Sequence, residues 1–232
     1  MRPRRLILFD IDGTLLWTRG AAKRAFLQAM MEVYGSSGPI ATHAFGGKTD
    51  PQIARELLRL AGFTDPAIDE GLPLLWAAYT RELRSELQSP LHETVVLPGV
   101  RELVGRLAAT TDVLVGLVTG NIVEGAMLKL ASASLDGVFR LGAYGSDSEH
   151  REELPAVAVQ RARALAGVEF RGRDVVVIGD TPADMTCGQG LGVCAIGVTT
   201  GSFDEVTLRD AGAHTVFPTL ADTDTVVGAL LG

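Results

Sequence analysis

The stretch Leu6–Leu16, LILFDIDGTLL, constrains the fold of this chain more than any other segment. It begins with four apolar residues in a row, which is typical of a strand buried on both faces of a parallel sheet. Two carboxylates, Asp10 and Asp12, follow with a single residue between them. Charged groups at the edge of a core are costly unless something pairs with them. Other parts of the chain should therefore supply partners for these two side chains.

Further apolar, β-branched runs have the same character, and helical patterns separate them. The runs cover 113–118, 175–178, 194–198 and, more weakly, 215–217. The helical patterns cover about 99–109, 121–132, 152–166, 182–190, 204–211 and 220–231. Strands that alternate with helices in this way predict an α/β fold with a doubly wound, Rossmann-like core around a parallel sheet.

The interval from Trp17 to about Leu97 breaks this alternation, because it holds no good strand candidate. It shows helical patterns at about 20–34, 50–61 and 66–88 instead. This interval is much longer than a crossover between neighbouring strands requires. We predict an inserted α-helical cap domain over residues 17–97, hinged near 17–20 and 90–98. The catalytic core would consist of residues 1–16 and 98–232.

Ligands bind at the carboxyl ends of the strands in a doubly wound sheet, so the residues that follow each strand are site candidates. Those residues are Asp10 and Asp12, then Thr119, Gly120 and Asn121, then Asp180 and Asp184. Carboxylate oxygens in this number suit Mg²⁺, which binds a carboxylate or two together with water and a substrate phosphate. The pattern therefore indicates a metal-dependent enzyme, with Asp180 completing the metal shell and Asp184 steadying the loop.

Each residue at the ends of the first two strands has a possible task beside a phosphate. Asp10 can attack phosphorus and form an aspartyl-phosphate while Mg²⁺ draws charge from the phosphate. Asp12 can protonate the leaving oxygen and later activate water. The Thr119 hydroxyl and the backbone amides of Gly120 and Asn121, at the start of a helix, can bind phosphate oxygens.

These residues stand in the segments DIDGTLL (10–16), VTGN (118–121) and IGDTPADM (178–185). In these segments the sequence resembles the haloacid dehalogenase superfamily of hydrolases, in particular its phosphoglycolate phosphatase and β-phosphoglucomutase type with a helical cap. The resemblance implies that Asp10 is the nucleophile and Asp12 the acid/base. It also implies a metal site formed by Asp10, the Asp12 backbone carbonyl, Asp180 and Asp184.

The family pattern also has a lysine between the second and last motifs, usually followed by a proline, but this chain has no lysine after Lys129. The best match is Arg151, in SDSEHREELPAVAVQRA. An arginine can supply the same positive charge to Asp10 and the phosphoryl group, with a two-pronged donor in place of a point charge. We therefore predict Arg151 as a catalytic residue.

The segment FGGKTDPQ (45–52), in a loop of the predicted cap, has two interpretations. Lys48 or Thr49 can reach the organic part of the ester and bind the substrate. Alternatively, the segment is a turn followed by a helix that begins with a capping side chain and Pro51. Both interpretations stay open on the sequence alone.

We predict a Mg²⁺-dependent phosphatase for a small phosphomonoester, phosphoglycolate-like or a sugar phosphate by the resemblance. A phosphomutase of the β-phosphoglucomutase type is the alternative on the same machinery. Halide displacement fits the acids less well than phosphate chemistry. A non-catalytic phospho-aspartate receiver is the rival from another class, although receivers are about half as long and lack a cap.

The net charge of −7, without a long basic run, argues against a nucleic-acid partner. No apolar run approaches the roughly 20 residues of a membrane span. We therefore expect a cytoplasmic protein that does not bind a membrane, as a monomer or a homodimer.

Overall fold

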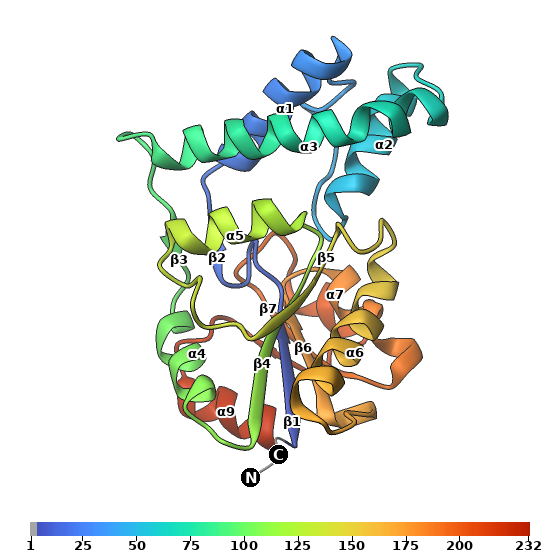
Figure 1. Cartoon of the computed structure of the whole chain (residues 1–232). Coiled ribbons are helices and arrows are strands. Elements are labelled where there is room, and N and C mark those ends of the chain that lie inside the picture. Colours follow the sequence, from blue (N-terminus) through green and yellow to red (C-terminus); the bar gives the residue numbers. More distant parts are fainter. Residues whose placement is uncertain (1–3) are drawn as a thin grey trace.

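The computed structural model describes residues 4–232, so the first three residues of the predicted core segment lie outside it. Its centre is a parallel sheet with the strand order β5-β4-β1-β6-β7-β8 (Figure 1). The strands are β1 (Arg5–Phe9), β4 (Val113–Thr119), β5 (Leu141–Tyr144), β6 (Val175–Gly179), β7 (Cys194–Val198) and β8 (Thr215–Phe217). Every pairing in this sheet is parallel, which confirms the predicted fold class.

The central strand β1 is buried on both faces, and alternate side chains enter two different apolar clusters. Ile7 and Phe9 pack in the cluster that contains residues of α4, α5 and α9. Leu6 and Leu8 pack on the opposite face with residues of α6. The helices of the core are α4 (Val100–Ala108), α5 (Val123–Ser132), α6 (Leu154–Ala166), α7 (Pro182–Cys187), α8 (Glu205–Asp210) and α9 (Thr223–Leu231).

Three helices form a separate layer over the carboxyl end of the sheet: α1 (Ala21–Tyr34), α2 (Asp50–Leu60) and α3 (Asp65–Gln88) (Figure 1). They share an apolar core of their own, in which Phe26 lies 5.2 Å from Tyr79, ring centroid to ring centroid. The helix α3 also packs across α5 of the core. The helical insertion predicted from the sequence is therefore present.

The expectation that this interval holds no strand is wrong, because its two ends pair with each other. Strands β2 (Leu16–Trp17) and β3 (Val95–Val96) form an antiparallel pair. The amide of Leu97 also donates to the carbonyl of Leu15 at 3.0 Å. Strands this short leave no periodic signal in a sequence. The pair lies at the predicted cap boundaries, and the boundaries themselves stay a prediction.

Strand β5 was also absent from the expected strands. It has four residues, LGAY, and lies at the edge of the sheet. A glycine within so short a run weakens the strand signal. Within residues 4–232, no helix is both long and apolar enough to cross a membrane.

Candidate active site

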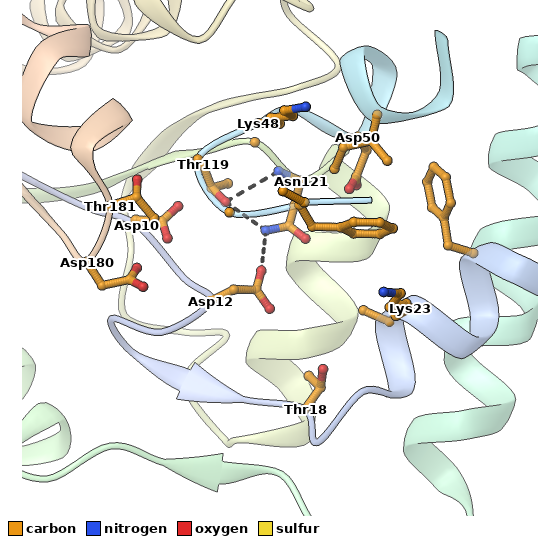
Figure 2. Close-up of a pocket in the computed structure, with 18 of the residues that line it drawn as sticks. Asp10, Asp12, Thr18, Lys23, Lys48, Asp50, Thr119, Asn121, Asp180 and Thr181 are labelled. Atoms are coloured by element: carbon orange, nitrogen blue, oxygen red, sulfur yellow. Dashed lines mark hydrogen bonds between the residues drawn. The ribbon is translucent and has the colours of Figure 1, made fainter. Parts of the chain in front are cut away.

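The carboxyl ends of β1, β4 and β6 meet beneath the helical layer, around a cavity of about 480 Å³ (Figure 2). The predicted site residues that line it are Asp10, Asp12, Lys48, Thr119, Gly120, Asn121, Arg151 and Asp180. Asp184 lies behind this lining and is fully buried, as is Thr49. The structure therefore brings together residues from five separate parts of the sequence.

Three buried carboxylates, Asp10, Asp180 and Asp184, form one acidic group. Each offers an oxygen within 4.8 Å of an oxygen of the others. Asp10 follows β1 directly, and its backbone amide donates to the carbonyl of Ile178 at 2.9 Å, which ties it to β6. Hard oxygen ligands at this spacing fit a divalent cation.

Arg151 lies beside this acidic group, at the start of a single 3₁₀ turn that precedes α6. Its Nη2 donates to Asp10 Oδ1 at 2.9 Å and also to Asp184 Oδ1. The arginine side chain is only 7% exposed. The guanidinium is therefore placed where it can act on Asp10, although its catalytic role stays a prediction.

Asp184 also holds the start of α7 in place. Its Oδ2 accepts hydrogen bonds from the backbone amide of Thr181 at 3.0 Å and from its hydroxyl at 2.7 Å. Thr181 is the N-cap of α7, and Pro182 occupies the first turn, where a missing N–H has no cost. One oxygen of Asp184 thus orders the loop while the other orients Arg151.

The acidic group carries more negative charge than its surroundings balance, with three carboxylates against one guanidinium. Burial raises the pKa of Asp10 to about 7, Arg151 opposes this rise, and Asp184 adds to it. Burial, followed by the charge of Asp10, raises the pKa of Asp180 to about 9. Burial lowers the pKa of Arg151, but the charges of Asp184 and Asp10 outweigh it and raise the pKa. A divalent cation would relieve this excess, so the donor set fits one.

Gly13 lets the loop after β1 pass close to Asp180. Its φ of +81° lies in the left-handed region, and a Cβ there would come within 2.3 Å of Asp180 Oδ2. The next residue, Thr14, donates its hydroxyl to Asp180 Oδ1 at 3.2 Å. The DIDGT segment therefore packs directly against the acidic group.

The second carboxylate, Asp12, is turned away from the acidic group and pairs with Lys129. Lys129 Nζ donates to Asp12 Oδ1 at 2.8 Å and to Asp12 Oδ2 at 2.7 Å. Lys129 was not among the residues predicted for the site. The available signal was a single lysine in VEGAMLKLAS, one turn after Gly125 on the buried face of α5.

Asn121 connects Asp12 to Thr119. Its Nδ2 donates to Asp12 Oδ2 at 2.8 Å and to Thr119 Oγ1 at 2.7 Å, as the dashed lines in Figure 2 show. The backbone amide of Asn121 donates to the same Thr119 oxygen at 3.4 Å. A hydroxyl accepts two hydrogen bonds and donates one. Because Asn121 occupies both acceptor positions, and no described residue accepts the Thr119 proton, this hydroxyl can donate to a ligand in the cavity.

The loop before α2 lies against the TGN loop. A Cβ on Gly120 would come within 2.1 Å of the Lys48 carbonyl oxygen, so only glycine fits there. Lys48 lines the cavity, and its ammonium pairs with Glu56. Thr49 caps α2 by accepting from Gln52 N at 3.2 Å, and its hydroxyl donates to the Glu149 carbonyl at 2.8 Å. Binding of the substrate by Lys48 or Thr49 stays a prediction.

The chain is similar to known proteins along almost its whole length. It is 27% identical over 237 residues to "Probable phosphatase IndB" of Dickeya dadantii (strain 3937), a match that covers 99% of this chain and 94% of the relative. A solved structure of a hydrolase from Pseudomonas syringae superposes with a TM-score of 0.72 at 20% identity, covering 97% of this chain and 98% of that one.

A predicted phosphoglycolate phosphatase from Haemophilus somnus 129PT superposes with a TM-score of 0.68 at 17% identity, covering 98% of this chain and 99% of that one. β-Phosphoglucomutase-like proteins also occur among the structural neighbours. The family model described as "Haloacid dehalogenase-like hydrolase" matches residues 7–198. With the strands, loops and acids of that segment in place, the chain belongs to the haloacid dehalogenase-like hydrolases.

Proposed function

We propose that this hydrolase is a Mg²⁺-dependent phosphatase that cleaves small phosphomonoesters through an aspartyl-phosphate on Asp10. The observation that carries the proposal is the acidic group with Arg151 against it, next to a second carboxylate, Asp12, in one cavity. The excess of negative charge in the acidic group calls for a cation before a phosphate dianion can enter. Mg²⁺ would be held by Asp10, Asp180, the Asp12 backbone carbonyl and Asp184, directly or through water, and would draw charge from the phosphate.

In the first half-reaction, Asp10 forms a bond to phosphorus while the bond from phosphorus to the ester oxygen breaks. Asp10 Oδ1 accepts from Arg151, whereas Oδ2 makes no hydrogen bond to any residue of the described chain and is available for attack. Asp12 gives its proton to the departing oxygen. The Thr119 hydroxyl and Arg151 donate to the phosphoryl oxygens, which stabilises their charge in the transition state.

In the second half-reaction, water attacks phosphorus and Asp12 accepts a proton from it. The bond between Asp10 and phosphorus breaks, which releases inorganic phosphate and restores the Asp10 carboxylate and the protonated Asp12 carboxyl group. The helical layer over the cavity would exclude bulk water during the first transfer. Lys48, which lines the cavity from that layer, is a candidate to contact the leaving group.

The experiment is a phosphate-release screen of purified protein on phosphorylated small molecules, including phosphoglycolate, hexose phosphates and an aryl phosphate. We expect release with Mg²⁺, loss of release in excess chelator, and recovery when Mg²⁺ is added back. Full activity in excess chelator would contradict the metal role. Interconversion of hexose phosphates without net phosphate release would favour the phosphomutase, and stable phosphorylation without turnover would favour the receiver.

A further inference from the structure

Lys129 has a place in the cavity that the steps above do not use. Its side chain is 4% exposed, and its ammonium makes three hydrogen bonds, two to Asp12 and one to Asn121 Oδ1 at 2.5 Å. An ammonium has three donors, so all of them are used. The lysine is thus fully occupied by Asp12 and Asn121.

We infer that Lys129 is a positioning residue that fixes the Asp12 carboxyl group where its protonated form can give a proton to the leaving group and its ionised form can take one from water. The inference rests on the proposed function, which gives Asp12 its acid/base task.

Packing alone does not explain a lysine at this position of α5. Its buried neighbours on the helix include Ala126 and Leu130, and a methionine would fill similar space without a charge. Replacing a buried ion pair by apolar side chains is often neutral or stabilising for a fold. The ammonium therefore contributes to the arrangement of the groups that it contacts.

That arrangement includes Thr119, the residue proposed to bind the phosphate. Because Asn121 Oδ1 accepts from Lys129, the carboxamide must present both N–H groups of Nδ2 to Asp12 and Thr119, as it does at 2.8 and 2.7 Å. Rotating the amide by half a turn would place its NH₂ group against the ammonium. Lys129 thus sets the position of the acid/base and of the phosphate-binding hydroxyl together.

The division of the two cations supports this assignment. Arg151 contacts Asp10 and Asp184, whereas Lys129 contacts Asp12. The arginine lies where charge develops on the phosphoryl group, and the lysine lies on the side of proton transfer. Loss of Lys129 should therefore affect the departure of the alcohol more than the attack on phosphorus.

The experiment compares leaving groups. A general acid matters most for a basic alkoxide and least for a phenolate that leaves readily. We expect Lys129→Met to lower kcat by roughly 10²-fold on an alkyl phosphate such as glycerol 1-phosphate, but by less than about tenfold on p-nitrophenyl phosphate. Lys129→Arg restores a cation and should recover part of the alkyl-phosphate activity.

Two controls separate positioning from a general loss of structure. Leu130→Ala removes the buried neighbour on α5 and should lower the rates on both esters by the same factor. In an Asp12→Asn background, Lys129→Met should lower kcat little further, because both changes affect the same proton transfer. Equal losses on both esters in Lys129→Met, or an additive loss in the double variant, would overturn the inference.

A crystal structure of Lys129→Met tests the position of the Asp12 side chain independently of any activity measurement. We expect Asp12 to lose its hydrogen bond from Asn121 Nδ2, and an unchanged Asp12 side chain would overturn the inference. If the wild-type protein releases phosphate from no ester, the proposed function fails, while this structural comparison still decides whether Lys129 positions Asp12.

Discussion

Two flanks of the same cavity place their charges in opposite ways. The Asp10 flank contains Asp10, Asp180, Asp184 and Arg151, and the Asp12 flank contains Asp12, Thr119, Asn121 and Lys129. On the Asp10 flank three carboxylates share one guanidinium, whereas on the Asp12 flank the Lys129 ammonium pairs directly with Asp12 alone. Burial raises the pKa of the nearby Asp50 to about 6, and the charge of Lys129 opposes this rise. The first flank is therefore shorter of positive charge than the second.

The difference shows how two carboxylates only two residues apart can do different chemistry. Asp10 is 6% exposed and lies within a group of like charges. A divalent cation bound there would relieve the repulsion between them. The Asp12 side chain is 33% exposed and is held by neutral and positive donors. In the proposed mechanism, the environment and not the residue type makes Asp10 the nucleophile and Asp12 the proton carrier.

The largest expected effect comes from Asp10→Asn, which removes the proposed nucleophile. We expect turnover to fall by roughly 10⁴-fold or more on every ester, as when a covalent nucleophile is removed elsewhere. Asp12→Asn, the matched change on the other flank, should retain measurable turnover of p-nitrophenyl phosphate. Steady-state kinetics test this contrast, with circular dichroism as the folding control. Normal turnover by Asp10→Asn would refute the nucleophile assignment.

A smaller effect is expected from Arg151→Met, which leaves the acidic group without its cation. The rate should fall by roughly 10²–10³-fold, because a charge-stabilising donor is lost. The free energy of unfolding of the metal-free protein should fall by about 3–5 kcal/mol. Arg151→Lys should recover part of both, since it restores the charge without the planar guanidinium. Wild-type rates and stability in Arg151→Met would remove the arginine from the site.

The smallest effect concerns the pH dependence of stability without metal. Burial raises the pKa of Asp180 to about 9 from an ordinary 3.8, so the folded protein holds this proton more tightly than the unfolded chain does. The folded state is therefore penalised progressively as pH rises from about 4 to about 9. The stability advantage of Asp180→Asn over wild type should grow by about 1–3 kcal/mol between pH 5 and pH 8.5.

Urea unfolding in chelator at the two pH values measures that advantage. Excess Mg²⁺ should shrink or reverse it, because the cation stabilises the wild-type folded state more strongly. An advantage that does not change with pH would mean that the acidic group is not strained by its own charge.

The rule that ligands lie at strand ends predicted the three acids of the Asp10 flank, whereas Arg151 was predicted from the family resemblance. Asp10 and Asp180 directly follow the apolar strands β1 and β6, whose signal is strong because they are buried on both faces. The start of α2 was also visible, since Thr49 and Pro51 have the chemistry of a capped first turn. Buried apolar strands and a capped first turn are local sequence patterns strong enough to predict these elements.

Of the four residues of the Asp12 flank, only Lys129 was not predicted from the sequence. Asn121 follows its strand, but Lys129 lies in the middle of a helix, and a single sequence does not show which face of that helix meets the cavity. Its pairing with Asp12 depends on how α5 sits on the sheet, which is a tertiary property. The short strands β2, β3 and β5 were missed for a similar reason, because partners and not local sequence define them.

The antiparallel pair of β2 and β3 makes the helical layer a modular part of the molecule. The chain leaves the core at Leu16 and returns opposite it at Val96, so the excursion begins and ends at nearly the same point. Segments of very different length can be exchanged between two such neighbouring points without altering the order of the sheet. Recombination or engineering could therefore combine the same hydrolytic centre with a different helical layer, and with it a different choice of substrate.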